Sequence, residues 1–179
     1  MEETGRDMEF TEQLREEHRV IEKALPMLER LASTFVGAEQ VLEFFQVFVD
    51  QCHHGKEELY LFPALETRGV KRREGLLREL LVEHGVTRRY VRDIAGLIHP
   101  ATVDENRDAR QLLDDLVPEL VALLQEHIEK EDTQLWPLAE QTLTAEDGAA
   151  LLAGFADLQQ NLIGERDYRR YLCWARLWR

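Results

Sequence analysis

Two segments of the chain carry the same residue types at the same spacing. HHGKEELYLFPALE at 53–66 and HIEKEDTQLWPLAE at 127–140 are identical at six of fourteen positions. Each begins with a histidine that is followed four residues later by a glutamate: His53 with Glu57, and His127 with Glu131. On a helix, residues four apart lie one turn apart on the same face, so both side chains of a pair can reach one metal ion. The recurrence predicts a duplicated unit with metal-binding chemistry.

A second phrase recurs before each of these segments. The sequences around His18 and His84 share the pattern Leu-x-x-Glu-His-x-Val, with Glu17 and Glu83 directly preceding the histidines. These two glutamates could orient imidazoles. Adjacent helix positions diverge by about 100°, however, so we expect both glutamates to face solvent. Each half of the chain therefore offers one lone histidine and one His-x-x-x-Glu pair.

Helical periodicity predicts the elements that must position these residues. Apolar stripes that include the histidines predict four long helices, at about 9–33, 38–63, 73–98 and 107–143. We expect Gly37 and Gly69 to mark turns and Pro100 to end the third helix, whereas Pro26 and Pro118 fall inside helices. Short connections favour antiparallel neighbours, so the predicted fold is all-α, an up-down-up-down four-helix bundle. A further helical segment is expected over about 145–179.

Composition agrees with one domain over 1–179, with its core bundle at about 9–143. The net charge of −13 disfavours nucleic acid and anionic membranes as partners. The charged N-terminal residues do not resemble a secretion signal, and no apolar stretch approaches the ~20 residues that cross a membrane. Cys52 and Cys173 form no CxxC pair, so we expect free thiols and a cytoplasmic location.

Taken together, the histidines and glutamates favour a metal centre over a purely structural polar core. A single histidine on an apolar stripe is more often a core residue, but burying four imidazoles and two carboxylates without compensation is costly. Imidazole and carboxylate ligands suit iron, with manganese and zinc as alternatives. Six ligands exceed a tetrahedral zinc site and suit two metals bridged by the glutamates. The Glu-x-x-His pattern of ferritin-like di-iron proteins is absent.

The order His, His-x-x-x-Glu, His, His-x-x-x-Glu, with Leu-aromatic-Pro after each glutamate, resembles the hemerythrin-like (HHE cation-binding) domain. The resemblance covers roughly residues 9–143 and implies a four-helix bundle with a non-haem di-iron centre bridged by an oxo or hydroxo group and two carboxylates. The implied ligands are His18, His53, Glu57, His84, His127 and Glu131, with Glu57 and Glu131 as bridges.

One residue departs from the oxygen-carrying members of that family. They have a fifth histidine one turn after the third-helix ligand, where this chain has Arg88, which cannot bind a metal. The chain therefore resembles the four-histidine, two-glutamate branch, for which reactions with dioxygen, nitric oxide or peroxide, or iron sensing, are described. We expect a protein that binds or reacts with such a molecule. The alternatives are an enzyme of peroxide disproportionation or nitric oxide reduction, a sensor without turnover, and a metal-free interaction bundle.

Several nearby residues leave the limits of the site open. A one-residue slip would pair His54 with Glu58, but the internal repeat favours His53 and leaves His54 as a supporting or surface residue. Tyr60 could donate a hydrogen bond or ligate, although core packing is the simpler expectation. Cys52 is expected to be a small buried hydrophobe.

The C-terminal segment ERDYRRYLCWARLWR is basic and aromatic in an otherwise acidic chain. Its spaced apolar residues are Tyr168, Tyr171, Leu172 and Trp178. The simpler interpretation is a helix that caps the bundle, and the alternative is a docking segment for a homodimer or another protein.

Overall fold

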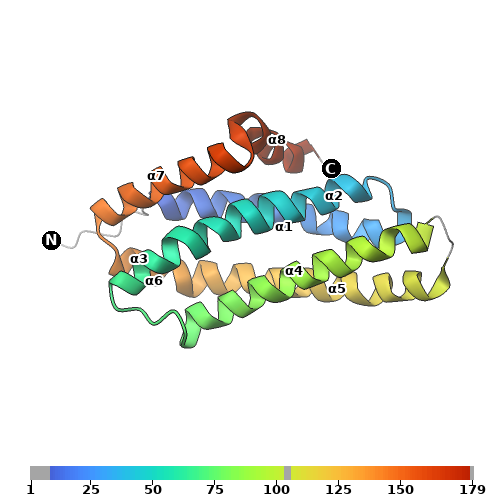
Figure 1. The fold of residues 1–179 in the computed structure, drawn as a ribbon, viewed down its shortest axis with the longest axis horizontal. Helices are drawn as coiled ribbons and strands as arrows, with labels where there is room; N and C mark the ends of the chain where they lie inside the picture. Colours follow the sequence, from blue (N-terminus) through green and yellow to red (C-terminus); the bar gives the residue numbers. More distant parts are fainter. Residues whose placement is uncertain (1–8, 103–105, 178–179) are drawn as a thin grey trace.

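The computed structural model describes residues 9–102 and 106–177, and the side chains within them except those of 32, 33 and 174–177. Four long helices lie side by side, and two further helices cover one face (Figure 1). The first is α1 (Glu9–Thr34) and the third is α4 (Gly75–Thr102). The second runs through α2 (Ala38–Glu43), η1 (Phe44–His54), η2 (Glu57–Leu61) and α3 (Phe62–Thr67). The fourth runs through α5 (Arg107–Lys130), η3 (Glu131–Leu135) and α6 (Trp136–Thr142).

The described residues contain no strand, which confirms the predicted all-α bundle. Gly37 and Gly69 lie at the predicted turns with φ of 73° and 93°, a region that glycine enters without strain. The prediction for Pro100 was wrong, because α4 continues through it to Thr102. A proline removes one backbone hydrogen bond, and in the last turn of a helix that loss does not prevent two more residues from remaining helical.

Along each long helix, apolar residues lie on either side of a buried polar layer. One apolar cluster includes Phe44, Phe45 and Phe48, and the other includes Phe62 and Trp136. The polar residues between them include His18, His53, Glu57, His84, His127 and Glu131, all buried. The two clusters thus hold the polar layer at a fixed height in the bundle.

Wide π-helical turns occur at the same place in both copies of the duplicated segment. Glu57–Leu61 and Glu131–Leu135 are π-helical, and each is followed by an α-helix with a proline in its first turn, Pro63 or Pro137. Proline cannot donate the backbone hydrogen bond that an α-helix requires there. A local π-turn is a common way for a helix to accommodate such an interruption, often beside a functional site.

The C-terminal extension forms α7 (Ala145–Leu162) and α8 (Gly164–Leu177), which pack against α1 and η1. Tyr168 and Tyr171 are buried in the apolar core, as expected for a helix that caps the bundle, while Trp178 lies outside the described residues. Tyr60 packs edge-on against Phe155 of α7, with ring centroids 6.2 Å apart. No helix in the described ranges is both long and apolar enough to cross a membrane.

Candidate metal centre

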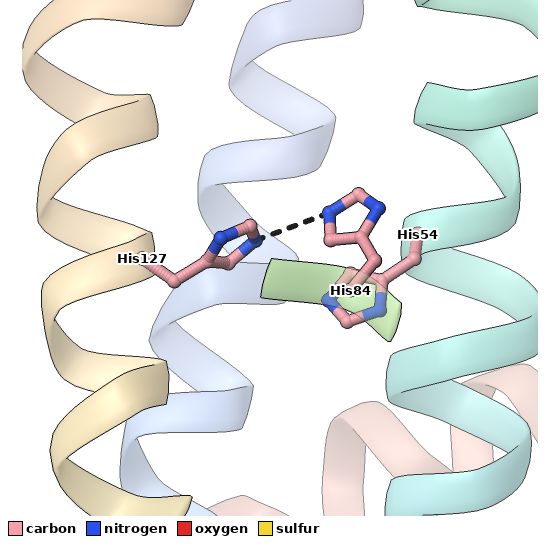
Figure 2. Close-up of side chains that lie close together, drawn as sticks. All are labelled: His54, His84 and His127. Carbon is pink, nitrogen blue, oxygen red and sulfur yellow. Dashed lines mark hydrogen bonds between the residues drawn. The ribbon is translucent and has the colours of Figure 1, made fainter. Parts of the chain in front are cut away.

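Two pairs of imidazoles meet at the centre of the bundle. His18 Nε2 lies 3.1 Å from His53 Nε2, and His84 Nε2 lies 3.2 Å from His127 Nε2. Figure 2 shows His84 and His127 approaching one another from separate helices, with His54 beside them. All four predicted histidine ligands therefore face the interior, and each pair combines histidines from two helices.

The two glutamates lie between the imidazole pairs. Glu57 Oε1 lies 3.6 Å from His53 Nε2, and its Oε2 lies 3.3 Å from His84 Nε2. Glu131 likewise reaches both pairs, at 3.0 Å from His18 Nε2 and 3.2 Å from His127 Nε2. Both carboxylates are fully buried, and three of their four oxygens have no hydrogen-bond partner.

These donor atoms form two overlapping sets with the spacing of metal ligands. One set is His18, His53, Glu57 and Glu131, and the other is Glu57, His84, His127 and Glu131. In each set one donor atom per residue lies within 4.8 Å of all the others. Unsatisfied buried carboxylate oxygens are costly unless a cation accepts their lone pairs, so the residues fit a pair of metal ions that shares both glutamates.

Each of the four predicted histidine ligands is held in place by a carboxylate from another helix. The Nδ1 atoms of His53 and His127 donate to Glu17 and Glu83, at 2.9 and 2.8 Å. The Nδ1 atoms of His18 and His84 donate to Asp132 and Glu58, at 2.9 and 2.8 Å. A proton on Nδ1 leaves the Nε2 lone pair free for a metal, the arrangement typical of metal-binding histidines.

The prediction that Glu17 and Glu83 face solvent was wrong. Glu17 is fully buried and Glu83 is only 18% exposed. Helical geometry does turn each glutamate away from the histidine that follows it, as predicted. It turns them toward the histidine of the neighbouring helix, which a comparison within one helix cannot reveal.

The remaining shared residues of the duplicated segment support the same layer. Lys56 donates to Glu17, and Lys130 donates to Glu83. The aromatic residue of each copy packs on a histidine: Phe62 stacks on His84, and Trp136 lies 5.4 Å from His18 between ring centroids. Trp136 Nε1 also donates to Asp132 at 2.7 Å. Sequence reasoning assigned no role to these residues, although their recurrence in both copies was the available signal.

Comparison with known proteins agrees with this geometry. The protein family described as "Hemerythrin HHE cation binding domain" matches this chain over residues 9–139, a range that includes the whole polar layer. The chain belongs to this family. A zinc finger protein BRUTUS-like from Arabidopsis thaliana is 28% identical over 150 residues, or 76% of this chain. The chain spans 12% of that relative's length. No solved structure matches the chain significantly.

In this hemerythrin-family layer, hydrogen bonds and ion pairs between buried acidic and basic side chains shift the pKa values of both. Burial disfavours the charged imidazole of His18, but hydrogen bonds to Asp132 and Glu131 outweigh burial and raise its pKa to about 10. Burial also disfavours ionised Glu17, yet Lys56 and His53 lower its pKa to about 2. The histidines likewise outweigh burial at Glu131 and hold its pKa well below the usual range. Glu17 and Glu131 are therefore ionised at neutral pH.

The two halves of this hemerythrin-family centre are not equally covered. Glu17 and Lys56 are each 0% exposed, whereas Glu83 and Lys130 are 18% and 24% exposed. The difference comes from α8, because the Tyr168 hydroxyl donates to Glu17 at 2.6 Å and its ring lies 4.8 Å from Lys56 Nζ. The C-terminal extension thus completes the surroundings of His53.

Arg88 points to acidic side chains near the hemerythrin-family site. Its guanidinium donates to Asp50 at 2.6 Å and to Glu58 at 2.5 Å. Glu58 also accepts the hydrogen bond from His84 Nδ1, so the Glu58 carboxylate connects Arg88 to that imidazole. Cys52 is buried, as expected, and burial raises the pKa of its thiol to about 12, so it is protonated at neutral pH. Both cysteines are free.

We predict that Glu17→Gln weakens metal binding by about 10–100-fold, because an amide holds His53 Nδ1 less firmly than a carboxylate does. It also leaves Lys56 buried without a counter-charge, which should lower the free energy of unfolding by about 3 kcal/mol. Metal titration and denaturant unfolding measure the two effects. The control is Glu22→Gln, an exposed residue of the same helix, which should match the wild type. Unchanged metal affinity in Glu17→Gln would refute the positioning role.

Proposed function

We propose that this protein binds two iron ions, each between one pair of imidazoles, and that Glu57 and Glu131 bridge them. The observation that carries the proposal is the group of three buried glutamate oxygens that lack hydrogen bonds among four inward-facing Nε2 atoms. His18 and His53 would hold one ion, and His84 and His127 the other. Zinc and manganese remain alternatives, because affinity alone does not select iron.

The chemistry of the donor set favours iron over a soft or tetrahedral metal. All six donors are imidazole nitrogens or carboxylate oxygens, and the protonated Cys52 thiol supplies no thiolate. Bound iron would supply a redox-active centre with coordination positions that the protein leaves open. The carboxylates on each Nδ1 would keep the imidazoles oriented toward it.

We further propose that the protein binds or reacts with dioxygen, nitric oxide or peroxide at this centre. Two six-coordinate ions need more donors than the six residues supply, even when both glutamates bridge. The apolar clusters above and below the layer exclude bulk water from it. Small uncharged molecules are the ligands that suit such a buried, apolar surrounding.

We predict that the purified, iron-loaded chain contains about two irons, and that His84→Ala loses at least one of them while retaining its helicity. The matched control is His99→Ala, which removes an exposed histidine from the last turn of α4 and should retain both irons. Metal analysis with circular dichroism provides the measurement. Wild-type protein that holds no metal after reconstitution would instead support a metal-free interaction bundle.

Metal should also stabilise the fold, because it neutralises the buried glutamates. With free metal at about 100 times Kd, the expected gain is about 2.7 kcal/mol, measured as a rise in Tm. Equal melting temperatures with and without metal would count against a sensor that is ordered by iron.

We predict that nitric oxide changes the visible spectrum of the iron-loaded protein, because open positions at the metal accept small exogenous donors. The same titration of the metal-free chain is the control and should show no change. Turnover of peroxide or nitric oxide would favour the enzyme, and binding without turnover would favour a carrier or sensor. A spectrum indifferent to all of these ligands would contradict the proposed reactivity.

A further inference from the structure

Tyr168 of α8 brings a hydroxyl group into the hydrogen bonds of the polar layer. The side chain is buried, and its hydroxyl donates to Glu17 Oε1 at 2.6 Å. The other oxygen of the same carboxylate accepts from His53 Nδ1 at 2.9 Å. Burial and the charge of Glu17 raise the pKa of Tyr168, so the hydroxyl keeps its proton and acts as the donor. A continuous path of hydrogen bonds therefore runs from the C-terminal extension through Glu17 to a predicted metal ligand.

Lys56 joins the ring of Tyr168 to the same carboxylate. The lysine is 0% exposed and donates to Glu17. Its Nζ atom lies 4.8 Å from the ring centroid of Tyr168 and 5.8 Å from that of Phe155 in α7. A cation that is excluded from water gains more from the faces of aromatic rings than an exposed one does. The extension thus supplies both a donor to Glu17 and an aromatic cover for the lysine that pairs with it.

The helix that leads into α8 is fitted closely to the bundle. Gly154 of α7 faces Tyr60 of η2, and a Cβ atom on this glycine would overlap the tyrosine ring. On the other side of the same contact, a Cβ atom on Gly55 would lie 3.3 Å from Leu158 of α7. This fit holds α7 against the second long helix, so α8 begins from a fixed place beside Glu17.

The internal repeat provides a comparison within the molecule. Glu83, the counterpart of Glu17, accepts from His127 and Lys130, and the described part of the chain offers it no tyrosine hydroxyl. Glu83 is 18% exposed, so part of its carboxylate faces solvent. The fold therefore builds the group of acid, lysine and histidine without a tyrosine. Tyr168 is an addition to one half of the layer.

The other half has a different addition, His54. This residue is 1% exposed and corresponds to the buried Ile128 of the second copy. Its ring stacks on His84, with centroids 3.9 Å apart and planes 14° apart. Lone pairs in the planes of two nearly parallel rings do not converge on one point, so His54 supports the layer by packing. Only the half with His53 is joined to the extension through a hydrogen bond in the described residues.

We propose that Tyr168 is a positioning residue for the metal held by His18 and His53, and that α8 docking and binding of that metal stabilise one another. The inference rests on the proposed metal pair. Tyr168 acts through Glu17, which orients His53 and so directs the lone pair of its Nε2 atom. Coupling between two equilibria is reciprocal, so a hydroxyl that strengthens metal binding is held more firmly once metal is bound.

The first test is a cobalt(II) titration of the full-length chain carrying Tyr168→Phe, which keeps the ring beside Lys56 and removes the hydroxyl. We expect the wild type to bind two ions and the variant to weaken one binding event by about 10-fold, the lower end of the range for groups that hold a metal ligand in place. The other event should be unchanged. In a chain that already carries Glu17→Gln, adding Tyr168→Phe should weaken binding no further, because the effect passes through Glu17.

The reciprocal effect is measured by hydrogen exchange of the α8 amides. Cobalt(II) should slow this exchange about 10-fold more in the wild type than in Tyr168→Phe, since the same coupling free energy governs both measurements. A side chain that only packs would lower the melting temperature without this dependence on metal.

The matched control is Tyr171→Phe. This change removes another buried hydroxyl of α8, one that donates at 3.0 Å to Glu43, an exposed residue of α2. The control should bind both ions with wild-type affinity. Wild-type affinity for both ions in Tyr168→Phe would overturn the inference and leave the two-metal site intact. Equal weakening of both events, or the same loss in Tyr171→Phe, would also overturn it, because either pattern indicates general packing. Failure of the wild type to bind two ions would refute the proposed function, and this inference with it.

Discussion

The structure depends on the burial of charge in the middle of an apolar bundle. Four imidazoles and two carboxylates lie in one layer, out of contact with solvent. Such a layer is unfavourable unless each polar atom finds a partner. Carboxylates satisfy the outer nitrogens of the four imidazoles, and lysines satisfy two of those carboxylates. The inner Nε2 atoms and glutamate oxygens remain, and the proposed pair of cations would satisfy them.

The duplicated sequence explains how one chain builds this layer. Each copy supplies a histidine, an inward-facing glutamate, a lysine, an outer acid and an aromatic residue, and the two copies face one another across the bundle. The outer acids Glu58 and Asp132 hold the lone histidines, while the acids of the other helices hold the histidines of the duplicated segment. The pseudo-symmetry is broken by α8 on one half and by His54 on the other.

Spacing within a single helix was enough to predict much of this arrangement. The four-residue step from His53 to Glu57 and from His127 to Glu131, together with the lone histidines, predicted the inward-facing set that the structure brings together. Contacts between helices could not be obtained in that way. Glu17 looked solvent-exposed because only its own helix was considered, whereas its partners His53 and Tyr168 come from η1 and α8. Spacing within one helix also could not predict that the Nδ1 atom of His54 lacks a hydrogen-bond partner, while Asp50 of the same helix accepts a hydrogen bond from Arg88.

The central claim is that the polar layer is a two-metal site. Anomalous X-ray diffraction at the iron absorption edge, on crystals of the iron-loaded protein, tests it most directly. Two anomalous peaks per chain are predicted, one between His18 and His53 and one between His84 and His127, with Glu57 and Glu131 flanking both. A single peak, or peaks away from these residues, would contradict it.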